Sequence, residues 1–360
     1  MQEHPWARIL RNRYVLNGAY AAVLLIVSAL VLGSAFRLGI NGYYRAMFTE
    51  MVDGTAHKPF VQRTLVPSTI GAISKLVPDE VKERTLRRIG GSEWLRELCN
   101  RLKWEPTHFV DYLIATAILY ASILLFALVF MRFFRIHYEA PPLFTRVLSL
   151  LAVAGLPVFF KYYSYVYDLT HLFLFTGCLV LLAERRWLPY LAALTVTTIS
   201  KETSILLILL FFVHYGSRLP RRRFWTLLGV QAALYVAVKA VLAYRFRDNP
   251  GGMLETQIAH NLYLSAFTPG GFVALVAVGV VVAHDWRAKP PFLRNGMLML
   301  APLVLLCLFC GFLDEYRAYY ETYPVVLALC GHGIAKALDV RPFGVRAPAE
   351  LSSPAAERPG

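Results

Sequence analysis

A polar stretch at residues 41–67 carries side chains that could perform chemistry. It holds two carboxylates, Glu50 and Asp53, either of which could accept the proton of an attacking hydroxyl as a general base. It also holds Arg63, whose planar guanidinium could bind a phosphate in a fixed, forked geometry. Three further residues of the stretch are candidates for substrate binding: Asn41, Tyr44 and His57. The alternatives are solvated carboxylates and an arginine that anchors to lipid headgroups.

A second candidate cluster interrupts the apolar sequence at residues 200–203, which read Ser-Lys-Glu-Thr. The apolar pieces on either side, at about 187–199 and 203–216, are each too short to cross roughly 30 Å of hydrocarbon upright at about 1.5 Å per residue. Ionisable groups at such a depth are costly unless they are paired or used. We therefore expect Lys201 to hold a phosphate and Glu202 to orient Lys201 or an acceptor hydroxyl. The alternative is a hairpin tip where water solvates both charges.

A third cluster brings together four charged residues near the C-terminal end: Asp314, Glu315, Arg317 and Glu321. We expect Arg317 to belong to a site, because an isolated basic residue there suits an anionic substrate. The alternative is self-pairing of Arg317 with Asp314 or Glu321 at helical spacing.

A tyrosine-rich run at residues 162–167 precedes Asp168 and His171. Such a run forms either an aromatic belt at the membrane surface or a rim on which a sugar could stack. The belt is the favoured interpretation.

The elements that must position these residues are membrane helices. The chain is 57% hydrophobic and 17% charged, with a mean hydropathy of +0.49, whereas a soluble domain has roughly a quarter charged residues. The apolar residues form continuous runs and do not alternate with polar ones, which favours helices over a barrel. We expect an all-α, polytopic integral membrane protein. The net charge of +14 does not indicate a nucleic-acid partner, because Lys and Arg gather in alternate loops, as they do in cytoplasmic loops of membrane proteins.

The pattern predicts about ten transmembrane helices in a single domain at residues 1–340. The expected spans are 14–37, 108–131, 144–160, 169–183, 187–199, 203–216, 224–244, 271–284, 293–313 and 323–337. The distribution of basic residues places both termini in the cytoplasm. The first loop, at about 39–107, is then extracytoplasmic, with amphipathic helices suited to the membrane interface. Residues 341–360, rich in Pro, Ala and Ser, are expected to form a disordered cytoplasmic tail.

The sequence indicates no cofactor. It contains no Gly-rich phosphate-binding loop, no HExxH motif and no Cys/His cluster with metal-ligand spacing. No metal site is therefore predicted, and a divalent metal stays an alternative that no motif supports.

Three motifs together resemble the polytopic glycosyltransferases of the C superfamily (GT-C), which use polyprenyl-phosphate sugars. The first is Pro-Phe-Val-Gln-Arg-Thr-Leu-Val-Pro at residues 59–67, after a first span and a tyrosine pair. The second is Lys-Glu-Thr at 201–203, and the third runs from Glu-Tyr-Arg at 315–317 to Tyr-Pro at 323–324. The resemblance covers residues 14–337. It departs at Asn41, because GT-C proteins typically carry an acidic residue, their catalytic base, at the head of this loop.

The resemblance implies an inverting glycosyltransferase of a bacterial cytoplasmic membrane, acting on the extracytoplasmic side. Its partners would be the lipid bilayer, a polyprenyl-phosphate sugar donor and a glycan, lipid or protein acceptor. Arg63, Lys201 and Arg317 would hold the phosphate, and Asp53 or Glu50 would replace the missing base. Two alternatives stay open: a transporter or flippase of lipid-linked glycans, and a non-catalytic assembly protein that kept the fold.

Overall fold

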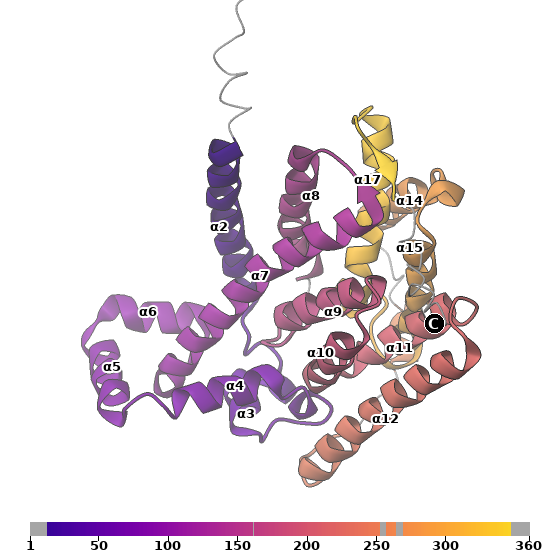
Figure 1. Ribbon diagram of the computed structural model, residues 1–360. Helices are drawn as coiled ribbons and strands as arrows, with labels where there is room; N and C mark the ends of the chain where they lie inside the picture. Colours follow the sequence, from indigo (N-terminus) through magenta and orange to yellow (C-terminus); the bar gives the residue numbers. More distant parts are fainter. Residues whose placement is uncertain (1–12, 161, 253–256, 264–268, 347–360) are drawn as a thin grey trace, which may run out of the picture.

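The computed structural model describes residues 13–160, 162–252, 257–263 and 269–346. In these ranges the chain is a bundle of helices of unequal length, with two short strands (Figure 1). The bundle helices are α2 (Arg13–Leu38), α7 (Phe109–His137), α8 (Pro142–Ala154), α9 (Asp168–Ala183), α10 (Trp187–Ser200), α11 (Ile205–Tyr215), α12 (Arg221–Arg245), α13 (Ile258–Tyr263), α14 (Pro269–Ala283), α15 (Pro291–Gly296), α16 (Leu300–Cys310) and α17 (Tyr323–Ala337). Short 3₁₀ helices extend or join them: η4 (Leu156–Phe159), η5 (Glu202–Ser204), η6 (Trp286–Ala288), η7 (Met297–Met299) and η8 (Tyr316–Thr322).

Helices occupy each range in which the sequence predicts a span. Within the described ranges, five helical regions are long and apolar enough to cross a membrane: Tyr14–Arg37, Pro106–His137, Pro142–Phe159, Arg221–Arg245 and Pro291–Cys310. Helices α9, α10 and α11 are shorter, and at about 1.5 Å per residue none reaches across roughly 30 Å of hydrocarbon. The chain therefore has the architecture of an all-α membrane protein, and the count of ten spans stays a prediction.

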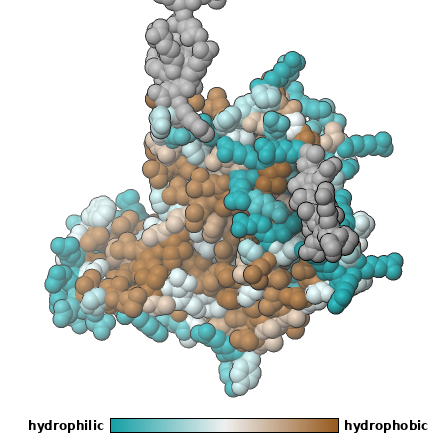
Figure 2. Space-filling view, viewed as in Figure 1, coloured by the Kyte–Doolittle hydropathy of each residue, from teal (hydrophilic) through white to brown (hydrophobic). Residues whose placement is uncertain are grey.

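Apolar side chains on the outside of the bundle fit this architecture. Figure 2 shows a broad hydrophobic surface over α2 and α7, bordered by hydrophilic residues along the edge of the α5–α6 arm. On α2, Leu25, Ile26 and Leu30 are exposed. Contiguous apolar surface on this scale indicates contact with a membrane or another protein.

Helix α7 is the centre of the packing. It contacts α2, α4, α8 and α9, and α10 in turn packs between α9 and α12. Phe126, Phe130 and Phe133 on α7 are almost fully buried, and Ala127 is fully buried beside them. This packing holds the short helices α9 to α11 against the long ones and places their polar ends at one side of the bundle.

The loop before α7 is itself mostly helical, as the sequence predicts. It contains η1 (Tyr44–Ala46), α3 (Phe48–Asp53), η2 (Phe60–Gln62), α4 (Leu65–Ser74), α5 (Asp79–Gly91), α6 (Glu93–Leu102) and η3 (Pro106–His108). Pro67 lies in the first turn of α4, where its missing N–H costs no helical hydrogen bond. Ser92 caps α6, because its Oγ accepts a hydrogen bond from the Leu95 N–H. Helices α5 and α6 project from the bundle as an arm (Figure 1).

The predicted disordered tail from residue 341 begins too early. Residues Gly344–Val345 form strand β2, which pairs antiparallel with β1 (Tyr138–Glu139). Phe343 explains the attachment, since its ring stacks on Tyr138 and meets His332 edge-on. Residues 347–360 of that tail, and the N-terminal basic residues up to Arg11, lie outside the described residues.

Candidate functional site

A polar cavity of about 570 Å³ lies where three of the predicted clusters meet, a size typical of small-molecule sites. Segments far apart in the sequence build it: the first loop, the tyrosine run with the start of α9, the break between α10 and α11, and the region from α16 to η8. Its lining includes five cations, Arg45, Lys58, Arg63, Lys201 and Arg317, and three carboxylates, Asp168, Glu202 and Glu315. The excess of positive charge suits an anionic ligand.

Arg63 and Glu202 form one edge of the cavity. The Arg63 Nε donates to Glu202 Oε2 at 3.1 Å, and its Nη2 pairs with Oε1, which gives a bidentate ion pair. Arg63 also donates to the Tyr167 hydroxyl. This pair joins the predicted loop to the predicted break, but Glu202 orients Arg63 and not Lys201. Burial would raise the pKa of the Glu202 carboxyl, yet the Arg63 guanidinium outweighs burial and lowers that pKa to about 2.

The local backbone explains why Glu202 can reach Arg63. Helix α10 ends at Ser200, Lys201 is extended, and one 3₁₀ turn leads into α11. The Tyr235 hydroxyl donates to the Glu202 carbonyl at 3.0 Å, which satisfies a carbonyl at this break. The side chains of Lys201 and Glu202 can therefore point in different directions at the cavity wall.

Lys201 lines the cavity and pairs with Glu321, which is not part of the lining. Its Nζ donates to Glu321 Oε1 at 2.9 Å. The same oxygen accepts from the Thr203 hydroxyl and lies 3.4 Å from His171 Nε2. Glu321 is fully buried, so burial acts to raise its pKa, but Lys201 and the donors around it lower that pKa below its usual range. Sequence reasoning missed Glu321 as the partner of Lys201.

Arg317 also lines the cavity and lies between two carboxylates. Its Nη1 donates to Asp168 Oδ2 at 3.1 Å and its Nη2 pairs with Glu315. Its guanidinium lies 3.9 Å from the centroid of the Tyr165 ring, a cation–π contact. The alternative, in which Arg317 pairs with Asp314 or Glu321, is wrong, because its partners are Asp168 and Glu315. The second carboxylate oxygen of Asp168, Oδ1, is buried and has no hydrogen-bond partner among the described residues.

The tyrosine run does not form a lipid-facing belt. Tyr165 and Tyr167 are buried with their rings stacked 5.5 Å apart, and Tyr165 lines the cavity with Tyr162 and Tyr163. The favoured interpretation is corrected because the first loop covers the run: Phe60 stacks on Tyr165 and Tyr43 packs against Tyr163. Aromatic faces therefore line the site beside the charges.

The structure does not bring the other candidates to the cavity. Glu50 and Asp53 lie on α3 and are absent from the lining, and Asp53 is exposed. Tyr44 is exposed, with its hydroxyl accepting from Arg45 Nε, and His57 lies edge-on to its ring. Their neighbours Tyr43, Arg45 and Lys58 line the cavity instead, so the sequence pointed to the right segments but not to the right faces.

Asn41 has a local structural role. Its Nδ2 donates to the Lys103 carbonyl at 2.8 Å and to the Tyr112 hydroxyl at 2.5 Å. Its Oδ1 accepts from the Phe48 N–H at 2.7 Å, at the first residue of α3. The side chain thus ties the start of the first loop to its end and does not face the cavity.

Asn41→Asp is therefore expected to destabilise the protein and not to supply a base. A carboxylate cannot donate to the Lys103 carbonyl, and losing a partner at a part-buried group costs about 1–3 kcal/mol. The thermal unfolding midpoint in detergent measures the loss, with Asn100→Asp on the exposed side of α6 as the control. A variant as stable as the parent that also gained activity would contradict this prediction.

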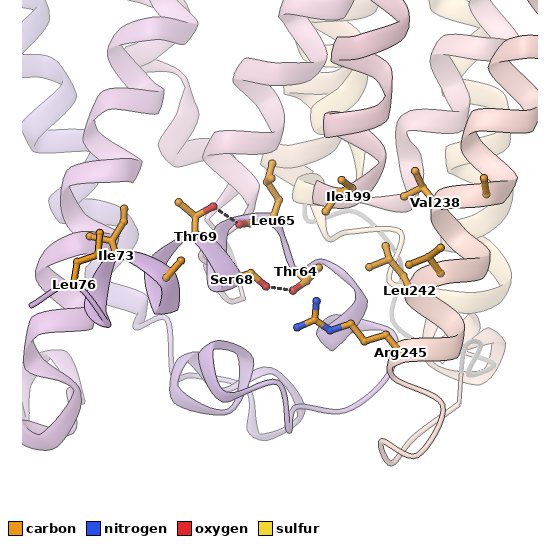
Figure 3. A pocket seen from close by; sticks show the side chains of 13 residues that line it. Thr64, Leu65, Ser68, Thr69, Ile73, Leu76, Ile199, Val238, Leu242 and Arg245 are labelled. Atoms are coloured by element: carbon orange, nitrogen blue, oxygen red, sulfur yellow. Dashed lines mark hydrogen bonds between the residues drawn. The ribbon is translucent and has the colours of Figure 1, made fainter.

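A second cavity, of about 680 Å³, lies on the other side of the segment that carries Arg63. Its walls are mainly apolar and come from α4 and α12, with Ile199 of α10 between them (Figure 3). Arg245, at the end of α12, is the charged residue of the lining.

Among the described residues, no group of three or more His, Cys, Asp and Glu side chains could hold a metal ion. The fold and site define the class: a helical membrane protein with a cation-rich, aromatic cavity beside an apolar one. Comparison with protein-family models, curated proteins and solved structures found no match to this chain.

Proposed function

We propose that the protein is a membrane glycosyltransferase that moves a sugar from a polyprenyl-phosphate donor to an acceptor hydroxyl. The observation that carries this proposal is the polar cavity, where cations outnumber carboxylates and tyrosine rings form the wall. Cations are the groups that bind a phosphate leaving group, and aromatic faces suit a sugar ring. The second, apolar cavity and the apolar helices support a donor that carries a lipid chain.

Lys58, Arg63 and Lys201 are the proposed phosphate ligands. Lys58 Nζ donates to the Arg247 carbonyl at 2.9 Å and keeps N–H groups for a ligand. Arg63 uses three of its five N–H donors on Glu202 and Tyr167. Fixed cations of this kind stabilise the charge that develops on a departing phosphate.

Asp168 takes the role of base in this proposal, in place of Glu50 or Asp53. Its Oδ2 is fixed by Arg317, and its Oδ1 is buried without a partner among the described residues. The acceptor oxygen forms a bond to the anomeric carbon while the bond from that carbon to the phosphate oxygen breaks. The acceptor proton passes to Asp168, polyprenyl phosphate leaves, and the single displacement inverts the anomeric centre.

The test is sugar transfer by Asp168→Asn in purified protein reconstituted with polyprenyl-phosphate hexoses and pentoses. The amide keeps the shape of the carboxylate but cannot take the proton, so the rate should fall by about 10² to 10⁴. Asp53→Asn and Glu50→Gln are the matched controls and should stay active. Transfer that survives in Asp168→Asn but is lost in Asp53→Asn or Glu50→Gln would return the role to the first loop.

The two alternatives predict different results. A flippase needs a polar path through the spans, but Lys239, the charged residue between the terminal arginines of α12, donates to Gln62 of the first loop at 3.2 Å. An assembly protein would show no transfer in the parent protein with any donor. Sugar transfer by the parent protein would therefore favour the enzyme over the assembly protein.

We further propose a bacterial cytoplasmic membrane as the location, with both termini in the cytoplasm and the polar cavity outside. Support comes from the clusters of basic residues at the other ends of the helices, such as Arg185, Arg186 and Arg221 to Arg223. The proposed acceptor is a glycan, lipid or protein on the outer side.

A further inference from the structure

We propose that the apolar cavity between α4 and α12 binds one bilayer phospholipid with an anionic headgroup. The cavity has a volume of about 680 Å³ and is separate from the polar cavity. This lipid is distinct from the proposed sugar donor, and the inference does not depend on the proposed function.

Each wall of the cavity is formed by one face of a helix, α4 on one side and α12 on the other. Helix α12 contributes Ala237, Val238, Val241, Leu242 and Arg245, a spacing that places them on one side of a helix. The segment 64–76, which contains α4, contributes residues three to four positions apart, and the apolar ones are Leu65, Ala72, Ile73 and Leu76. The cavity is therefore a trough bounded by two helices, a shape that suits a hydrocarbon chain.

The hydroxyl groups in the trough do not need a ligand. Thr64 and Ser68 are hydrogen-bonded to each other, and the Thr69 hydroxyl donates to the Leu65 carbonyl (Figure 3). With these groups satisfied, the surface offered to a ligand is apolar along most of its length. Water finds few hydrogen-bond partners there, whereas a lipid chain is stabilised by burying its apolar surface against these walls.

Arg245 supplies a charge at one end of the trough. Its side chain extends from α12 across the cavity toward Thr64 (Figure 3). Among the described residues it has no carboxylate partner, and its contact is the face of Phe246 at 5.2 Å. An arginine placed in this way selects a phosphate through paired N–H donors.

The length of α12 places Arg245 at headgroup level. The helix has 25 residues, about 37 Å at 1.5 Å per residue, and so it reaches across the hydrocarbon of a bilayer. Arginines stand at both ends, Arg221 to Arg223 and Arg245. A headgroup at Arg245 would leave its chain to run along Leu242, Val241 and Val238 into the membrane.

The trough is distinct from the proposed donor site because Arg245 lines the apolar cavity, whereas Arg63 lines the polar one. Arg63 precedes Thr64 directly, but its guanidinium is bound to Glu202 and Tyr167 on the polar side. Arg245 lines the apolar cavity and not the polar one. Each cavity thus has its own phosphate-binding cation.

The experiment measures lipid binding by native mass spectrometry of purified protein with phosphatidylglycerol or phosphatidylcholine. We expect one tightly retained phosphatidylglycerol and weaker retention of phosphatidylcholine. Arg245→Gln should weaken phosphatidylglycerol binding about tenfold or more, as expected for a lost charge-assisted bond. The matched control is Arg247→Gln, because Arg247 is exposed and outside the trough.

Filling the trough tests the chain-binding part. Ala237→Phe, or Ala72→Phe from the opposite wall, should remove the retained lipid while thermal unfolding still shows a folded protein. Equal retention of both lipids, or equal loss in Arg245→Gln and Arg247→Gln, would overturn the proposal. Displacement of the lipid by polyprenyl phosphate at equimolar amounts would also overturn it, since the trough would then belong to the donor.

Discussion

Replacing Glu321 by alanine is expected to destabilise the protein strongly. Glu321 is fully buried and holds Lys201, whose side chain is only 8% exposed. Without the carboxylate, a charged ammonium stays in a buried position with no counter-ion. Breaking a buried pair in this way costs about 3–5 kcal/mol.

Thermal unfolding in detergent measures this loss, and a double variant shows its cause. Lys201→Met combined with Glu321→Met removes both charges and should recover most of the stability, because apolar replacements of a buried pair are often neutral or better. The surface control is Glu83→Ala, which removes an exposed pair with Arg87 and should change stability by less than about 0.5 kcal/mol. If Glu321→Ala proved as mild as Glu83→Ala, the pair would not hold Lys201.

The helical architecture was predictable because it depends on local properties of the sequence. Continuous apolar runs identify helices such as α7 and α12 directly, and the polar break at Lys201 separates α10 from α11 as predicted. The number of membrane spans could not be predicted from local sequence in the same way. A helix as short as α11 can cross when tilted, end within the bundle or pack against its neighbours, and these outcomes depend on tertiary contacts.

The site was predictable in its residue types and less so in its pairings. Arg63 and Lys201 line one cavity, as expected from their clusters, but Lys201 pairs with Glu321, 120 residues away. Asn41 and Glu50 belong to the right loop and face away from the cavity. Their orientation is set by the short helix α3 and by hydrogen bonds to Lys103 and Tyr112 at the far end of the loop, which no local pattern reveals.

Replacing Arg63 is the second change with a large expected effect, and its size should depend on pH. Arg63→Met leaves Glu202 partly buried without its guanidinium, at a cost of about 3–5 kcal/mol near neutral pH. Arg63→Lys keeps the charge but loses the forked geometry, so it should retain part of the stability and lose most phosphate binding. Binding of polyprenyl phosphate to the purified variants measures the second effect.

The pH dependence follows from the pKa of Glu202. In the parent protein this pKa is lowered to about 2 from an ordinary value of 4.5, so the pair contributes stability that is fully present above pH 4.5 and is lost as pH falls toward 2. In Arg63→Met, burial is the largest influence left on the carboxyl, ahead of a backbone hydrogen bond and Lys239, which act in the opposite direction. We therefore expect the pKa of Glu202 to rise, so the variant should lose stability as pH rises through that value. The gap in unfolding midpoint between parent and variant should therefore be widest near neutral pH and close at acidic pH.

The matched control for this gap is Arg101→Met, which breaks an exposed pair with Glu97 on α6. Its effect should be small at every pH, because water replaces the partner. Arg63→Met with Glu202→Gln removes the stranded charge and should abolish the pH dependence as well as recover stability. A gap that stayed constant with pH would show that Arg63 stabilises the site through its contacts with Phe60 and Tyr167 and not through Glu202.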